Sequence, residues 1–313
     1  MKAAIVRKAG EMPVYDSFEA PIAGAGECTV DVIAAALSPL ARARASGAHY
    51  SSTGQYPFVA GVDGVGTLED GRRVYFVLPR APFGAMAERT VVSVDRCVAL
   101  PDGLDPEMAA ALANPGMSSW AALTCRADLK PGETVLINGA TGASGQLAVK
   151  IARHLGAATV IATGRSAGKL DGLGADATIL LGDDAEALEQ RFAAVFAGGV
   201  DVVVDYLWGM SAERMLMAAA KAGPQGRRLR FVQVGNASGA NIALPGAVLR
   251  SAAIELMGSG IGSVPFQGLV GSIAGVFGAA QAAGLTLPIR TAPLAEVAEV
   301  WPLGDDLRTV FRI

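Results

Sequence analysis

The segment from Gly139 to Gly145 has the residue types of a phosphate-binding loop. It reads Gly-Ala-Thr-Gly-Ala-Ser-Gly and follows the apolar run 134–138, which we expect to be a buried strand. Glycines permit a tight turn and close packing of the next helix, whose first N–H groups and positive dipole end then face a diphosphate. A purely structural turn is the alternative, but the flanking strand and amphipathic helix favour a dinucleotide. The expected contacts are Gly139, Thr141, Gly142, Ala143, Ser144 and Gly145.

The end of the following strand indicates which dinucleotide binds. Sites for NAD usually place Asp or Glu there, on the ribose 2′-hydroxyl. This strand ends Ile-Ala-Thr-Gly-Arg165 and has no acid. A guanidinium suits the 2′-phosphate of NADPH, and Ser166 and Lys169 add a hydroxyl and a charge. Arg165 as an ordinary surface arginine is the alternative; the missing acid favours NADPH.

Strands and helices alternate around this loop. We expect strands at 134–138, 158–163, 177–181, 200–206, 230–234 and 253–257. We expect helices at 144–155, 167–173, 185–194, 211–222 and 244–250. Short apolar strands that alternate with helices predict an α/β fold with a doubly wound parallel sheet of the Rossmann type.

The segments on either side of this region do not show the regular alternation of strands and helices. Irregularly spaced β segments are expected at 2–7, 27–37, 64–68, 73–77 and 88–94, which indicates a compact, partly barrel-like β domain. A helix at 106–112 is expected to break at Asn114-Pro115-Gly116, with another helix at 118–125. No charge occurs between Leu256 and Ile289, but the apolar spacing there predicts a packed helix rather than a membrane span. The segment 287–293, a helix at 294–301 and a final strand at 307–313 follow.

The composition excludes several classes of protein. Hydrophobic residues make up 51% of the 313 residues and the net charge is −3, which excludes a disordered chain and gives no attraction to nucleic acid. The three cysteines are scattered, so we expect no disulfide framework and a reducing, cytoplasmic compartment. Three dispersed cysteines and two histidines outside ligand spacing predict no metal site. Neither a nucleophile elbow nor a Walker A motif is present.

Several segments carry a family resemblance. Pro57-Phe-Val-Ala-Gly-Val-Asp-Gly-Val-Gly66 and the segment 37–47 are similar to stretches of the medium-chain dehydrogenase/reductase superfamily, and so is 293–299. Val62-Asp63 and Ser38 stand where zinc enzymes have His-Glu and a cysteine ligand. The chain therefore resembles the zinc-independent, quinone oxidoreductase-like branch. This resemblance implies a β-rich (GroES-like) catalytic domain at 1–115 and 260–313, and a nucleotide domain at 116–259.

The resemblance also implies site residues. Further cofactor contacts are expected at Asn114, Tyr206, Gly235 and Asn236, and the substrate cleft is expected to lie between the domains. Its candidate lining residues are Ser38, Tyr50, Met117 and Trp208. A packing role is the alternative for Tyr206, Met117 and Trp208. Ser38, Ala41 and Ala43 replace the Asn, Asp and Tyr of related enzymes. Tyr50 and Ser38 are therefore only weak catalytic candidates, and water is another proton source.

Hydride transfer without a metal needs an acceptor that is already electrophilic. Quinones and α,β-unsaturated carbonyls meet this requirement, since conjugation spreads the charge, while the protein orients the reactants and excludes water. We therefore expect an NADPH-dependent reductase of such a small molecule. A 2-enoyl thioester reductase is one alternative, with Arg42, Arg44 and Arg250 as candidate carrier contacts. A non-catalytic NADPH sensor is another. The strand at 253–257 suggests a homodimer.

Overall fold

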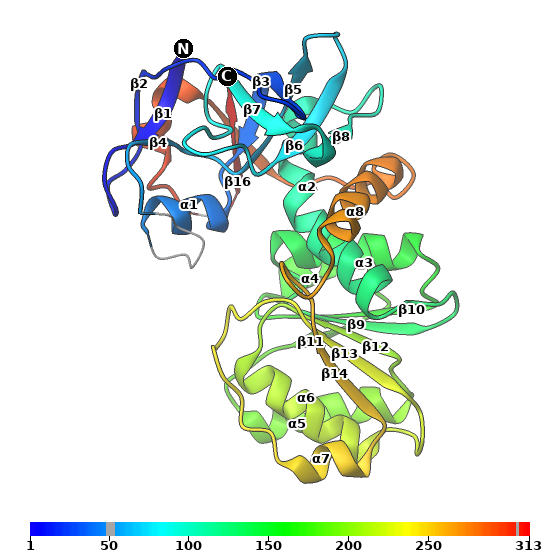
Figure 1. Ribbon diagram of the computed structural model, residues 1–313. Helices are drawn as coiled ribbons and strands as arrows, with labels where there is room; N and C mark the ends of the chain where they lie inside the picture. The colour runs from blue at the N-terminus through cyan, green and yellow to red at the C-terminus, as the bar shows by residue number, and fades with distance from the viewer. Residues whose placement is uncertain (48–53, 305–306) are drawn as a thin grey trace. The chain divides into compact units, whose positions relative to one another are not determined.

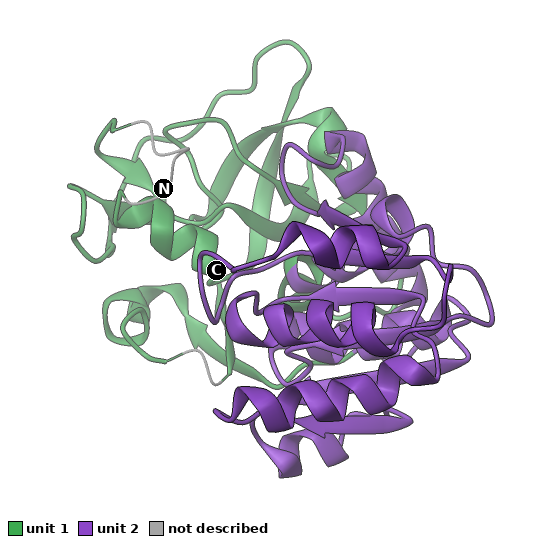
Figure 2. Cartoon of the chain, turned by 90° about the horizontal axis from the view of Figure 1, so that it is seen from below, with its two compact units in different colours: residues 1–114, 286–313 green, residues 115–285 purple. Residues whose placement is uncertain are grey.

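A computed structural model describes residues 1–47, 54–304 and 307–313. The chain divides into two compact units, shown in green and purple in Figure 2. Unit 1 comprises residues 1–114 and 286–313, and unit 2 comprises residues 115–285. The second boundary differs from the expected one at residue 260, because the segment 260–285 packs within unit 2. A Cβ at Gly116 would lie 2.8 Å from Val276 of this segment.

Unit 2 is built on a parallel sheet with the strand order β11-β10-β9-β12-β13-β14. The order runs outward in both directions from β9, which is the Rossmann arrangement. Its strands are β9 (Thr134–Asn138), β10 (Thr159–Gly164), β11 (Ala177–Leu180), β12 (Val202–Asp205), β13 (Leu229–Gln233) and β14 (Ile254–Gly258). The central strands form because their residues are apolar and almost fully buried, as a sheet covered on both faces requires.

Helices cover both faces of this sheet (Figure 1). Helix α3 lies on one face, and α5 and α6 lie together on the other, where Phe192 and Phe196 of α5 enter the core. The helices of unit 2 are α3 (Ala143–His154), α4 (Ala167–Asp171), α5 (Ala185–Ala197), α6 (Gly209–Ala222), α7 (Gly246–Ser251) and α8 (Phe266–Ala279). The expected doubly wound α/β fold is confirmed.

Helix α2 (Pro106–Ala121) corrects one expectation. It continues through Pro115, where we expected a break, and passes directly into a π-helical turn at Ala122–Arg126. The proline carbonyl accepts hydrogen bonds from the Ser118 and Ser119 hydroxyls, at 2.9 and 3.0 Å. Tertiary packing at Gly116 thus outweighs the local cost of a proline inside the helix.

Unit 1 contains a mixed seven-stranded sheet and a three-stranded sheet. Phe76, Phe311 and Met86 are at the centre of its core. The strands of the larger sheet are β3 (Glu27–Ala36), β5 (Asp63–Leu68), β6 (Arg73–Val77), β7 (Arg89–Ser93), β8 (Cys97–Ala99), β15 (Ile289–Pro293) and β16 (Arg308–Arg312). The smaller sheet has β1 (Lys2–Val6), β2 (Val14–Ser17) and β4 (Phe58–Val59). Short helices are α1 (Pro39–Ala45), η1 (Val94–Arg96), η3 (Leu294–Glu296) and α9 (Val297–Val300).

The uncharged segment after β14 forms helix α8. Leu269, Ile273, Val276 and Phe277 are buried along one side of it, as the spacing predicted. In the part of the chain that the structure describes, no helix has both the length and the apolar character needed to cross a bilayer.

Candidate functional site

The glycine-rich turn between β9 and α3 is held rigidly against β10. The backbone N–H of Gly139 donates to the Thr163 hydroxyl at 3.1 Å, and Ala140 N–H donates to the Thr163 carbonyl at 2.8 Å. Gly139 has φ +85°, a conformation that favours glycine. A Cβ at Gly145 would lie 2.3 Å from the Gly139 carbonyl oxygen. These two glycines are therefore required by the turn itself.

The middle glycine of the turn faces open space instead. A Cβ at Gly142 would meet only the Gly139 carbonyl oxygen, at 3.8 Å. Gly142 is also the N-cap of α3, and no side chain caps that helix. The first N–H groups of a helix have no acceptor within the helix. The N–H groups of Ala143 and Ser144 are therefore available to an anion at the positive end of the helix dipole. The turn thus fits a diphosphate.

The end of β10 lies directly beside this turn. A Cβ at Gly164 would be 2.6 Å from Thr141 Cγ2, so Arg165 begins at the corner of the turn. Arg165, Ser166 and Lys169 are exposed. Among the described residues, the Arg165 and Lys169 side chains form no hydrogen bond or ion pair. Two uncommitted cations that follow the end of this strand, which carries no carboxylate, suit a 2′-phosphate.

A buried polar network lies where the sheet order reverses, between β9 and β12. Asn138 Nδ2 donates to Asp205 Oδ1 at 2.7 Å and to Ser211 Oγ at 2.9 Å, and its own Oδ1 accepts from the Thr163 hydroxyl at 2.6 Å. Burial raises the pKa of Asp205, and its hydrogen bonds to backbone N–H groups and Asn138 offset part of the rise. In open α/β sheets, ligands bind where the strand order reverses. The network therefore lies at the place where we expect the cofactor to bind.

The Tyr206 hydroxyl is bound within the protein. It lies 2.8 Å from Ser119 Oγ, which in turn lies 2.9 Å from the Ser144 carbonyl and 3.0 Å from the Pro115 carbonyl. Since Ser119 has one proton and two carbonyl acceptors, Tyr206 is the donor to Ser119. Burial raises the pKa of the phenol well above its usual value. Tyr206 is thus linked to the start of α3 through Ser119.

Gly235 closely approaches the backbone of Tyr206, because a Cβ at Gly235 would lie 2.7 Å from the Tyr206 carbonyl oxygen. Asn236 follows and is exposed. The structure thus brings Tyr206, Gly235 and Asn236 together at the carboxyl ends of β12 and β13. Asn114 is the last residue of unit 1 and is half-buried in α2.

The expected substrate residues have other surroundings. Trp208 packs against Phe231, with ring centroids 6.4 Å apart, and has φ +59° and ψ −153°, a region otherwise used by glycine. Met117 packs on the cluster of Ala121, Val264 and Leu269. The packing alternative therefore accounts for both side chains.

The two weak catalytic candidates gain no support. Ser38 is 1% exposed in unit 1, and its hydroxyl accepts a 3.1 Å hydrogen bond from Ala41 N–H as the N-cap of α1. The hydroxyl is the acceptor in that bond, and a catalytic role of Ser38 stays a prediction. Tyr50 lies outside the described residues.

Sequence analysis missed a small aromatic pocket within unit 1. Its volume is about 90 Å³, and Tyr56, Phe58 and Phe83 line it together with Arg44 and Val62. The rings of Tyr56 and Phe58 are 5.4 Å apart. The signal in the sequence was the pair of segments Tyr-Pro-Phe and Ala-Pro-Phe, each of which places an aromatic ring directly after a proline.

Across residues 1–47, 54–304 and 307–313, no three His, Cys, Asp or Glu side chains cluster as a metal site requires.

Comparisons with known proteins agree with this geometry. The family model of zinc-binding dehydrogenases matches residues 143–274. A probable NADPH-dependent quinone reductase of Emericella nidulans is 33% identical over 319 residues, covering 88% of each protein. An acrylyl-CoA reductase of Ruegeria pomeroyi is 32% identical and covers 48% of this chain and 50% of its own length. The quinone oxidoreductase of Thermus thermophilus, solved also with NADPH, has a TM-score of 0.80 and 27% identity over the full length of both chains.

The chain therefore belongs to the quinone oxidoreductase-like group of the medium-chain dehydrogenase/reductase superfamily.

Proposed function

We propose that this chain is an NADPH-dependent oxidoreductase that reduces a conjugated acceptor, a quinone or an α,β-unsaturated carbonyl, without a metal. Membership of the quinone oxidoreductase-like group supports the oxidoreductase class and the cofactor. The observation that carries the cofactor assignment is the uncapped glycine turn beside Arg165 and Lys169, with no acid on the strand end. Bound NADPH supplies the hydride.

The residues of this chain then have separate tasks. The open face of Gly142 and the first N–H groups of α3 hold the diphosphate, and Arg165 and Lys169 hold the 2′-phosphate. The Asn138–Asp205 network and the Ser119–Tyr206 hydrogen bond keep the turn and α3 in place before binding. Such preorganisation supports orientation, which is the main contribution that a protein makes to hydride transfer.

The aromatic pocket of unit 1 is our candidate for the acceptor. Tyr56, Phe58 and Phe83 offer flat apolar faces on which a conjugated ring can stack. Its small volume favours a single ring. Because the pocket suits a single ring, we propose a quinone as the acceptor in preference to an enone. The match to the quinone reductase of Emericella nidulans, which covers 88% of this chain, supports the same preference.

A 2-enoyl thioester reductase remains the second candidate, because an acrylyl-CoA reductase matches half of the chain. One expected carrier contact is already engaged. The Arg42 guanidinium donates to the carbonyls of Trp301 and Leu303 and lies over the Trp301 ring. This commitment counts against the thioester reading. A non-catalytic NADPH sensor is the third candidate.

The test compares NADPH with NADH in the wild type, Arg165→Ala and a matched control. The acceptors are 1,4-benzoquinone, 9,10-phenanthrenequinone and crotonyl-CoA. Loss of a charged hydrogen bond predicts that Arg165→Ala raises KM for NADPH by about 10- to 100-fold and leaves KM for NADH unchanged. Lys221→Ala removes an exposed charge from α6 of the same unit and should change neither constant.

Each other outcome points elsewhere. A preference for NADH, or an equal rise for both cofactors, would refute the role of Arg165. Turnover confined to crotonyl-CoA would favour the thioester reductase. Tight NADPH binding with no turnover on any acceptor would favour the sensor.

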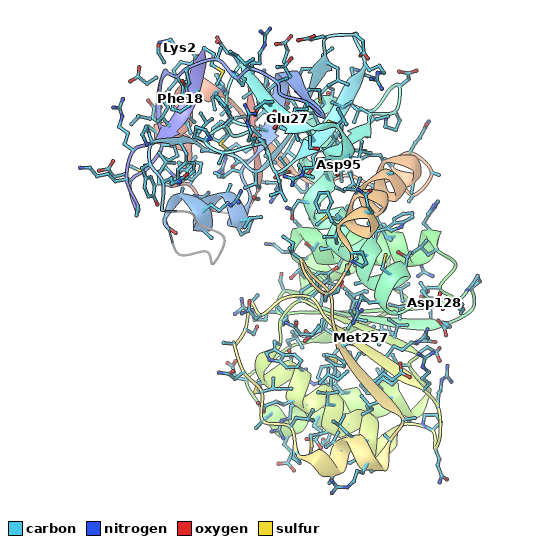
Figure 3. The ribbon with its side chains drawn as sticks, viewed as in Figure 1. Lys2, Phe18, Glu27, Asp95, Asp128 and Met257 are labelled. Carbon is cyan, nitrogen blue, oxygen red and sulfur yellow. The ribbon has the colours of Figure 1, made fainter. Side chains whose placement is uncertain are left out.

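We also propose that the chain acts in the cytoplasm as a homodimer joined at β14. This strand pairs only with β13 among the described residues, and Leu256 on it is 39% exposed. Met257, labelled in Figure 3, is its neighbour. Leu256→Asp should shift sedimentation from dimer to monomer. Leu180→Asp is the control, because Leu180 is 45% exposed on β11 at the opposite edge of the same sheet. A monomeric wild type would contradict the proposal.

A further inference from the structure

Two cysteines that are far apart in the sequence meet within unit 1. The Sγ atoms of Cys28 on β3 and Cys97 on β8 are 3.8 Å apart, although 69 positions separate the residues. The strands themselves are not hydrogen-bonded. Within the described sheet, β3 pairs with β16, β5 and β7, and β8 pairs with β6. The two thiols therefore face each other between β3 and β8, two strands of one sheet that have no backbone hydrogen bonds with each other. We call this place the seam.

The seam is accessible to small molecules. Both cysteines are half-buried and line a cavity of about 700 Å³. Glu27 and Asp95, labelled in Figure 3, lie one position before Cys28 and two positions before Cys97 in the chain. The Glu27 carboxylate is paired with Arg80 at 2.6 Å. A neutral solute can therefore reach the sulfurs from the cavity.

The charged groups around the seam are largely paired with one another. On the β5–β6 turn, Arg72 pairs with Asp70 at 2.7 Å. Glu69 accepts a 2.8 Å hydrogen bond from Thr29. Burial, and then the neighbouring Cys28, raises the pKa of Cys97 to about 12. Cys97 is thus held as a thiol and is a poor first nucleophile.

We propose that Cys28 and Cys97 form an oxidisable dithiol site that hydrogen peroxide converts to a disulfide. The Cys28 thiolate attacks one peroxide oxygen, the O–O bond breaks, and Cys28 sulfenic acid and hydroxide form; the hydroxide takes up the thiol proton to become water. Cys97 then attacks the sulfenic sulfur, the S–O bond breaks, and a second water leaves. Two thiols are oxidised and one peroxide is reduced to two waters. This inference does not depend on the proposed reductase activity.

The site has a structural consequence. The short separation requires each sulfur to move by less than about 1 Å to reach the bonding distance of about 2 Å. The bond would join β3 to β8 and close the seam covalently. A cross-link across a long loop restricts the unfolded chain, so the oxidised protein should unfold at a higher temperature than the reduced protein.

The experiment treats the reduced full-length protein with a modest excess of hydrogen peroxide and then alkylates it under denaturing conditions. Peptide mapping should show a linked peptide pair containing Cys28 and Cys97, with the loss of two alkylatable thiols per chain and recovery on reduction. Cys125 is exposed and serves as an internal reference that should remain alkylatable. This measurement on the wild type does not depend on any variant folding.

Single variants then test the order of events. Cys97→Ser lacks the resolving thiol, so Cys28 should proceed to the sulfinic and sulfonic acids, which thiol reductants do not reverse. Cys28→Ser should leave Cys97 reduced under the same treatment, and Cys125→Ser should still form the link. The proposal is overturned if Cys28 and Cys97 stay free at peroxide levels that oxidise Cys125, or if Cys125 supplies the disulfide.

Discussion

The side-chain amide of Asn138 donates a 2.7 Å hydrogen bond to Asp205 Oδ1 and thereby joins β9 to β12 at the reversal of the sheet order. The same carboxylate accepts from the N–H groups of Leu207 and Trp208. One buried carboxylate therefore links the ends of two paired strands to the entry into α6. The unusual backbone of Trp208 is held by this cap.

Asn138→Leu should destabilise the protein strongly. The substitution leaves Thr163 Oγ without its acceptor and removes one of the donors to the buried Asp205 carboxylate, so we expect a loss of about 2–4 kcal/mol in the free energy of unfolding. Urea unfolding followed by tryptophan fluorescence measures it. Asn241→Leu changes an exposed asparagine of the same unit and should cost less than about 0.5 kcal/mol. Equal losses in the two variants would contradict the argument.

Gly145→Ala should abolish tight NADPH binding. The new Cβ would lie 2.3 Å from the Gly139 carbonyl oxygen and 2.6 Å from Ala140 Cα, so the turn must shift away from its binding geometry. Titration of NADPH fluorescence should show an affinity at least about tenfold weaker. Gly168→Ala in α4 is the matched control, because its Cβ meets nothing within 4 Å. That variant should bind normally and gain up to about 1 kcal/mol in stability. Unaltered binding by Gly145→Ala would refute the proposed turn.

Tyr206→Phe should keep its catalytic rate. The phenol is buried as a donor to Ser119, and burial raises its pKa, so it is poorly suited to giving a proton to a substrate. We expect kcat within about threefold of wild type and a loss of about 1 kcal/mol in stability from the missing hydrogen bond. Steady-state kinetics and thermal unfolding check both. A fall in kcat of about 100-fold with unchanged stability would assign the hydroxyl to catalysis instead.

Asp63→Asn should change how stability depends on pH. Burial raises the pKa of Asp63 above 3.8, and Arg308 and the hydrogen bond from Tyr75 offset only part of the rise. Because the folded pKa is the higher one, the stabilisation from this group is complete below the unfolded pKa and is lost as the pH rises through the folded value. The variant lacks that loss and should gain stability relative to wild type as the pH rises from 4 toward 7.

Asp70→Asn is the control of opposite sign. Hydrogen bonds from Arg72 lower the pKa of this exposed carboxyl, so its stabilisation is present above the unfolded pKa and is lost as the pH falls. Unfolding curves across the same pH range should show the two variants diverging from wild type in opposite directions. Parallel pH profiles for all three proteins would contradict the assignment for Asp63.

The nucleotide-binding unit was predictable because its strands are buried on both faces. Expected strands such as 134–138 and 177–181 match β9 and β11 within one residue at each end. Such strands appear as short apolar runs, and the glycines between them mark the turns. Arg165 could be placed beside the phosphate turn for the same reason, since a strand end and a turn fix its position.

Other features depend on contacts between distant parts of the chain. The continuation of α2 through Pro115 rests on the close approach of Val276 to Gly116, about 160 positions away, which no local pattern encodes. The meeting of Cys28 with Cys97 likewise depends on how the sheet curls. A serine before a proline suits both a substrate loop and a helix N-cap, so the N-cap role of Ser38 emerges only from its contact with the Ala41 N–H.

Strand β16 pairs with β3 on one side and β15 on the other, so it is an interior strand of the unit 1 sheet. It is also made after the whole of unit 2 during synthesis. The ribosome therefore releases a complete nucleotide-binding unit while the amino-terminal sheet still has an open edge along β3. We expect unit 2 to fold first on the ribosome, and the nascent β3 edge to require protection, for example by a chaperone, until residues 308–312 emerge.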